Sequence, residues 1–188
     1  GDGWHAHPTQ ALLDAYTARS HLGDLAGRRI AIVGDVKHSR VARSNIEMFT
    51  ALGAEVTLVA PPTLLPPDTG AWDVQVSHEL DPVLPEVDIC YLLRMQNERM
   101  TEALVPTLRE YTAGFGLTSE RADRLRPGAL IMHPGPMNRG VEIASEVADR
   151  PNAVITEQVA NGVAVRMAVL FMLLGSGRHL AQAPEETP

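Results

Sequence analysis

The chain has a single cysteine among its 188 residues, which excludes an internal disulfide and any cysteine-based metal cluster. Cys90 stands in an apolar run, so we expect a buried, inert thiol. Positive charge is also scarce. The formal net charge is -7 at pH 7, which disfavours nucleic acid and anionic membranes as partners, although local arginines could still bind a small anion. The longest strongly apolar run, residues 167–174, is too short to span a bilayer.

Several sequence motifs are missing. A secretory signal pattern is absent, so we expect a cytoplasmic location. Only Gly34 follows the first apolar strand, whereas NAD or FAD binding calls for G-x-G-x-x-G at that point. The sequence contains no P-loop, nucleophile elbow or H-E-x-x-H pattern. His5 and His7 stand two residues apart with no sulfur ligand nearby, so we expect neither a metal site nor a cofactor.

What remains is the composition of an ordinary globular domain, with 45% apolar and 21% charged residues. The length suits one domain, or one domain with appendages. The chain opens abruptly at "GDGWHAHPTQ". We therefore expect that the sequence begins inside a longer protein.

Apolar strand patterns alternate with helical patterns along the chain. "RRIAIVGD", for example, is a continuous apolar run of the kind that is buried on both faces of a parallel sheet. Alternation of this kind predicts an α/β fold, a Rossmann-like parallel sheet of about five strands flanked by helices. We expect strands within residues 28–35, 55–61, 72–78, 88–94 and 129–135, and helices within 7–22, 39–54 and 161–175. The last of these helices is apolar nearly all round, which is typical of a helix buried between other elements.

Basic and amide side chains follow two of the predicted strands. Arg40 follows the first strand, whereas Arg94, Gln96 and Arg99 follow the fourth. Ligands of parallel sheets bind beyond the carboxyl ends of the strands, and two guanidinium groups from different strands suit a dicarboxylate. The alternative is that these arginines lie on the surface and pair with nearby acids.

The fifth strand runs into a proline turn, "IMHPGPMNRGVEI". Pro134 and Pro136 have no backbone N–H, and they push His133 and Gly135 toward extended conformations. The segment is therefore stiff. It could present its carbonyl groups to a ligand, or it could be a rigid turn that closes the strand.

Four motifs in this order resemble the aspartate/ornithine carbamoyltransferase family: "HPTQALLD", "VGDVKHSRVARS", "LLRMQNERM" and "MHPGPMNRGVEI". The resemblance covers the chain up to about residue 177. Ornithine enzymes carry a cysteine within the fifth-strand motif, as H-C-L-P, where this chain has Pro134. The resemblance therefore favours the aspartate branch, and it implies carbamoyl transfer from carbamoyl phosphate to L-aspartate in pyrimidine biosynthesis.

The resemblance also implies residue roles on the carbamoyl side of the site. His7 would donate a hydrogen bond to the carbamoyl carbonyl oxygen and polarise it. Gln10 would hold the carbamoyl NH2 group together with the backbone carbonyls of Pro134 and Gly135. In that case the proline turn serves to present acceptors. The alternative is that His7 and Gln10 only begin a helix.

On the aspartate side, the resemblance implies that Arg40 and Arg94 bind the two carboxylates, with Gln96 assisting. Arg99 would order the loop that carries Arg94, and Arg43, one turn along the helix from Arg40, would be structural. Such a site works by holding an amine against an electrophilic carbonyl, without a covalent intermediate.

The family's carbamoyl phosphate domain precedes the HPTQ motif and is not found in this sequence. We therefore expect the chain alone to be inactive. For the full-length protein we expect L-aspartate and carbamoyl phosphate as substrates and a homotrimer as the assembly. The alternatives are a non-catalytic dicarboxylate-binding or assembly remnant, or a transferase for another amino acid. The expected parts are an interdomain bridging helix (1–22), an aspartate-binding domain (23–157), a helix that packs on the carbamoyl phosphate domain (158–177) and a tail (178–188).

Overall fold

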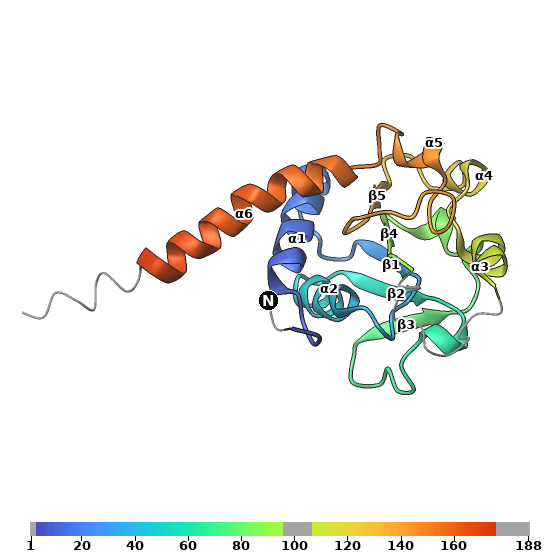
Figure 1. Cartoon of the computed structure of the whole chain (residues 1–188), viewed down its shortest axis with the longest axis horizontal. Helices are drawn as coiled ribbons and strands as arrows, with labels where there is room; N and C mark the ends of the chain where they lie inside the picture. Colours follow the sequence, from blue (N-terminus) through green and yellow to red (C-terminus); the bar gives the residue numbers. More distant parts are fainter. Residues whose placement is uncertain (1–2, 96–106, 176–188) are drawn as a thin grey trace, which may run out of the picture.

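The computed structural model describes residues 3–95 and 107–175, and it contains a five-stranded sheet in the order β3-β2-β1-β4-β5 (Figure 1). Every neighbouring pair is parallel. This arrangement confirms the predicted α/β fold. The strands are β1 (Arg29–Val33), β2 (Glu55–Val59), β3 (Val74–Ser77), β4 (Ile89–Leu92) and β5 (Leu130–Met132).

Helices cover both faces of this sheet. Alternate residues of β1 enter different hydrophobic clusters, because successive side chains of a strand point to opposite faces. Ile32 packs in one cluster with residues of α1 and α2, whereas Val33 packs in the other with residues of α4 and α5. The helices are α1 (Pro8–Leu22), α2 (Arg40–Ala51), α3 (Leu108–Phe115), α4 (Ser119–Ala122), α5 (Ser145–Ala148) and α6 (Ile155–Gly175), with 3-10 turns η1 (Pro62–Leu64) and η2 (Leu84–Glu86).

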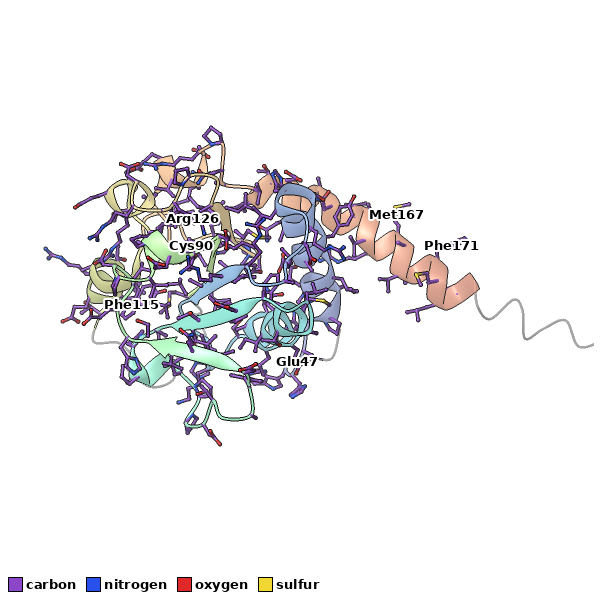
Figure 2. All side chains as sticks on the ribbon, turned by 180° about the vertical axis from the view of Figure 1, so that it is seen from behind. Glu47, Cys90, Phe115, Arg126, Met167 and Phe171 are labelled. Carbon is purple, nitrogen blue, oxygen red and sulfur yellow. The ribbon has the colours of Figure 1, made fainter. Side chains whose placement is uncertain are left out.

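Helix α6 differs from the prediction in two ways. It begins at Ile155, so the boundary expected at residue 158 falls inside the helix. It was expected to be buried, yet only Ile155, Gln158 and Gly162 are buried, all in its first half. That half packs on α1, and the rest extends away from the body of the protein, carrying Met167 and Phe171 (Figures 1 and 2). The helix thus has an apolar surface and few neighbours to bury it.

By length and composition alone, the same helix could span a membrane. Its 21 residues have a mean hydropathy of 1.5 over the most apolar window, whereas its uninterrupted apolar run is only residues 167–174. Helices of soluble proteins can be equally long and apolar, so these two properties do not by themselves indicate a membrane span. The expected tail at 178–188 lies outside the described residues.

Candidate functional site

One cavity brings together six of the seven residues predicted to form the site. It has a volume of about 230 Å³ and lies where the carboxyl ends of β1, β4 and β5 meet the start of α1. Gln96, the seventh residue, and Arg99 lie outside the described residues. The cavity is lined by His7, Gln10, Ser39, Arg40, Val41, Arg94, Pro134, Gly135 and Pro136.

The start of α2 places Arg40 at the cavity. Ser39 caps this helix by accepting a hydrogen bond from the backbone N–H of Ala42 at 3.1 Å, and Arg40 is the first helical residue. The Arg40 guanidinium donates to the backbone carbonyl of Gly3 at 2.6 Å. Arg43, one turn further, donates to the backbone carbonyls of the segment that precedes α1 and does not line the cavity.

His7 precedes α1 and is half-buried at the cavity edge. Its backbone N–H donates to the hydroxyl oxygen of Ser44 at 2.8 Å. Partial burial lowers the pKa of His7 below 6.5, and the nearby positive charges of Arg40 and Arg166 lower it further. The imidazole is therefore neutral at pH 7, with one ring N–H to donate and one ring nitrogen to accept.

The proline turn after β5 is fixed by buried hydrogen bonds. The backbone N–H of Gly135 donates to His133 Nδ1 at 2.9 Å, so the ring proton of a neutral His133 is on Nε2, which donates to Glu142 Oε1 at 3.2 Å. The same Glu142 oxygen accepts from the backbone N–H of Asn138 at 2.6 Å. Gly135 has φ of +65°, a left-handed conformation that L residues with a side chain rarely adopt, and not the extended conformation expected of the residue before Pro136. These hydrogen bonds fix the segment 133–136, called the ledge below, and the ledge brings Pro134 and Gly135 to the cavity.

The ledge is also joined to the segment that carries Arg94. The Asn138 side-chain amide donates to the backbone carbonyl of Met95 at 3.1 Å. Sequence reasoning missed Asn138 and Glu142, because nothing local indicates that a glutamate in a turn will be wholly buried. It also missed the buried Asp14, whose side chain accepts from the Gln10 amide at 3.0 Å. The helical i, i+4 spacing of that pair was the available signal.

The charge of the cavity is positive. Arg40 and Arg94 line it, and none of the described residues around it is acidic. A larger hollow of about 670 Å³ lies beside α3 and α4, but there Arg121 and Arg124 are already paired with Asp81. The smaller cavity combines two guanidinium groups, a histidine, an amide and the proline turn, and it is the better candidate for a polar ligand.

Residues 26–173 match the family described as aspartate/ornithine carbamoyltransferase, Asp/Orn binding domain. The chain belongs to this family. Aspartate carbamoyltransferase catalytic subunits of Acidothermus cellulolyticus and Thermobifida fusca are 64% and 58% identical to it, over 94% and 95% of this chain. Those alignments cover 55% and 57% of the two relatives. The carbamoyltransferase chain described here therefore spans about half the length of the curated relatives it matches.

Solved carbamoyltransferases share the fold. Aspartate transcarbamoylase from Trypanosoma cruzi, in complex with aspartate and phosphate, superposes with a TM-score of 0.76 at 31% identity, covering 91% of this chain and 55% of that one. Ornithine carbamoyltransferase from Thermus thermophilus gives a TM-score of 0.77 at 28% identity, covering 90% and 56%. Both branches of the family thus share this α/β domain, and the choice of acceptor depends on the site.

Proposed function

We propose that this chain is the aspartate-binding part of an aspartate carbamoyltransferase, which converts carbamoyl phosphate and L-aspartate into N-carbamoyl-L-aspartate and phosphate in pyrimidine biosynthesis. The observation that carries the proposal is the convergence of Arg40 and Arg94 on one cavity beside the Pro134–Gly135 ledge. The names of relatives 58–64% identical to the chain support it. The cytoplasmic location expected from the sequence is part of the proposal and agrees with a free, buried Cys90.

In the proposed reaction, the two arginines bind the carboxylates of aspartate, and Gln96 assists. This charge pairing holds the amino group close to the carbamoyl carbon. The neutral amine attacks that carbon, the new C–N bond forms, and negative charge develops on the carbonyl oxygen. His7 donates a hydrogen bond to that oxygen. The C–O bond to phosphate then breaks, and the departing phosphate takes the proton that the nitrogen loses.

The carbamoyl NH2 group is held by acceptors. Pro134, Gly135 and Gln10 line the same cavity, and their carbonyl and amide oxygens are the acceptors in this proposal. An NH2 group has two N–H donors, so a set of fixed acceptors orients it and turns the carbonyl carbon toward the amine. In this proposal, the stiffness of the ledge keeps these acceptors in a fixed position.

The exposed apolar face of α6 is evidence that another segment packs on this helix. Eight of its large apolar residues are more than half exposed, and five of them share one side of the helix by their spacing: Val163, Met167, Leu170, Phe171 and Leu174. Fully burying such side chains contributes about 1.5–3 kcal/mol each, so covering this partly exposed set is worth on the order of 5–10 kcal/mol. We propose that a carbamoyl phosphate-binding segment, which precedes the HPTQ motif in the family, packs on this face, and that the full-length protein forms homotrimers.

The test is complementation. This chain is co-produced with the N-terminal segment of the Acidothermus cellulolyticus relative, and the pair is called the complemented protein below. We expect carbamoyl-aspartate formation by the complemented protein and none by the chain alone. Substantial turnover by the chain alone would show that no second segment is needed. A folded complex that binds succinate without turnover would favour a non-catalytic dicarboxylate-binding protein.

Ornithine is the acceptor to compare, because an ornithine carbamoyltransferase shares the fold at 28% identity. Ornithine has one carboxylate and a second amino group. Two guanidinium groups at the cavity therefore favour the dicarboxylate. Faster turnover of the complemented protein with ornithine than with aspartate would contradict the assignment of the acceptor.

A further inference from the structure

A buried carboxylate lies directly behind the cavity. Asp14 has no exposed surface, and both of its oxygens accept hydrogen bonds from neutral groups. Oδ2 accepts from the Tyr91 hydroxyl at 2.6 Å and from the Asn45 amide at 2.9 Å. Oδ1 accepts from the amides of Gln10 at 3.0 Å and Gln158 at 2.7 Å. The first pair anchors the carboxylate to β4 and α2, and the second pair leads toward the cavity.

The orientation of the Gln158 amide is fixed by the backbone N–H of His133, a group that can only donate. Its Oε1 accepts from the backbone N–H of His133 at 3.0 Å, and a backbone N–H cannot accept. The other end of the amide must therefore be the NH2 group, and this group meets Asp14 Oδ1. Oδ1 is thereby identified as an acceptor.

The orientation of the Gln10 amide follows in turn. Because Oδ1 of Asp14 is an acceptor, the NH2 group of Gln10 faces it. The guanidinium of Arg166, which can only donate, lies 3.5 Å from Gln10 Oε1 and agrees with this orientation. Gln10 lines the cavity, and with its NH2 group turned to Asp14 its oxygen is the atom that can accept from a ligand. An acceptor at this position selects a ligand group that carries N–H donors.

We propose that Asp14 is a positioning residue, whose buried carboxylate turns the Gln10 oxygen toward the cavity and, through Gln158, holds the strand end that carries the Pro134 and Gly135 carbonyls. One carboxylate thereby links the Gln10 oxygen and the Pro134–Gly135 carbonyls, the acceptors proposed for the carbamoyl NH2 group. This inference rests on the proposed function. Burial raises the pKa of Asp14, and the four hydrogen bonds donated to it oppose that rise.

The experiment compares three variants of the complemented protein. Asp14→Leu keeps the approximate volume but removes the acceptor that the NH2 groups of Gln10 and Gln158 share. We expect kcat/KM for carbamoyl phosphate to fall about 10- to 100-fold, with KM for aspartate changed less than about twofold, because the two glutamines that Asp14 holds are assigned to the carbamoyl group and not to the carboxylates. Asp14→Asn can still turn its oxygen toward both glutamines, while its NH2 group donates to the Tyr91 hydroxyl oxygen and, once the Asn45 amide turns over, to Asn45 Oδ1, which has no partner among the described residues of the wild type. We expect it to restore kcat/KM to within about threefold of wild type.

Tyr91→Phe is the matched control. It removes a hydrogen bond to the same carboxylate but leaves both glutamine contacts in place. We expect a lower melting temperature and kcat/KM within about twofold of wild type. A folded Asp14→Leu variant with full activity, or a Tyr91→Phe variant that loses as much activity as Asp14→Leu, would show that Asp14 only stabilises the fold.

Two further measurements keep the test decisive. If Asp14→Leu does not fold, Gln158→Met removes the contacts to both Asp14 and His133 while leaving the Gln10–Asp14 contact in place, and it must lower kcat/KM for carbamoyl phosphate without raising KM for aspartate. NMR of the side-chain NH2 groups of Gln10 and Gln158 must show slow proton exchange in the wild type. Fast exchange there would refute the orientation of the amides directly. A wild-type complemented protein without turnover would count against the proposed function, whereas the NMR result tests Asp14 by itself.

Discussion

Replacing Arg40 with methionine tests the dicarboxylate site most directly. Met retains most of the aliphatic bulk of the side chain and removes the guanidinium. In the structure that guanidinium is half-buried and donates to the Gly3 carbonyl at 2.6 Å. A bound carboxylate would therefore replace a neutral acceptor with a charged one, and the gain is the difference between the two hydrogen bonds.

That difference sets the expected magnitude. A hydrogen bond to a charged group contributes about 1.5–3 kcal/mol, and one between neutral groups about 0.5–1.5 kcal/mol. The net contribution of Arg40 to binding is then about 1–2 kcal/mol, because the side chain is also partly screened by solvent. Since about 1.4 kcal/mol corresponds to a factor of ten, Arg40→Met should weaken the binding of a dicarboxylate about 5- to 30-fold.

The assay is calorimetric titration of succinate into the complemented protein. Arg43→Met is the matched control, because Arg43 lies one turn along the same helix and donates to the Trp4 and His5 carbonyls without lining the cavity. We expect it to lower the melting temperature and to change Kd by less than about twofold. Unchanged affinity in Arg40→Met, or an equal loss in both variants, would refute the argument that Arg40 binds the ligand.

Three further predictions concern charge and the exposed helix. Arg166→Met should raise the pKa of His7, because a positive charge that disfavours the imidazolium is removed; NMR titration of His7 checks this, and an unchanged pKa would contradict it. A hydrogen bond from Arg121 lowers the pKa of Asp81 below 3.8, so Asp81 stabilises the fold above that pH and loses this effect as the pH falls through its folded value. Asp81→Asn should therefore flatten the acid side of a plot of melting temperature against pH, and an unaltered acid limb would count against the ion pair. Phe171→Lys should reduce self-association of the chain in sedimentation experiments and weaken complementation by the second segment, without changing a signal from phospholipid vesicles; vesicle binding that depends on Phe171 would favour a membrane role for α6 instead.

The fold could be predicted from the sequence because its signals are local. The continuous apolar run at Arg29–Val33 can be buried on both faces only inside a parallel sheet, and the structure places it at the centre. The residue types of the site could also be read from the motifs. Their convergence could not, because Arg40, Arg94 and the ledge come from three elements, and a shared cavity depends on which strands become neighbours.

The sequence by itself determined the alternation of strands and helices, the stiffness of the proline turn and the identity of the candidate ligand-binding groups. Only the tertiary structure showed that Asp14 contacts Gln158 across 144 residues of sequence and that Glu142 is buried beneath the ledge. It also showed α6 to be largely exposed, although its composition predicted burial. The physical reason is range: hydrophobic period and backbone stiffness act over a few residues, whereas burial of a charge or a helix face depends on everything packed around it.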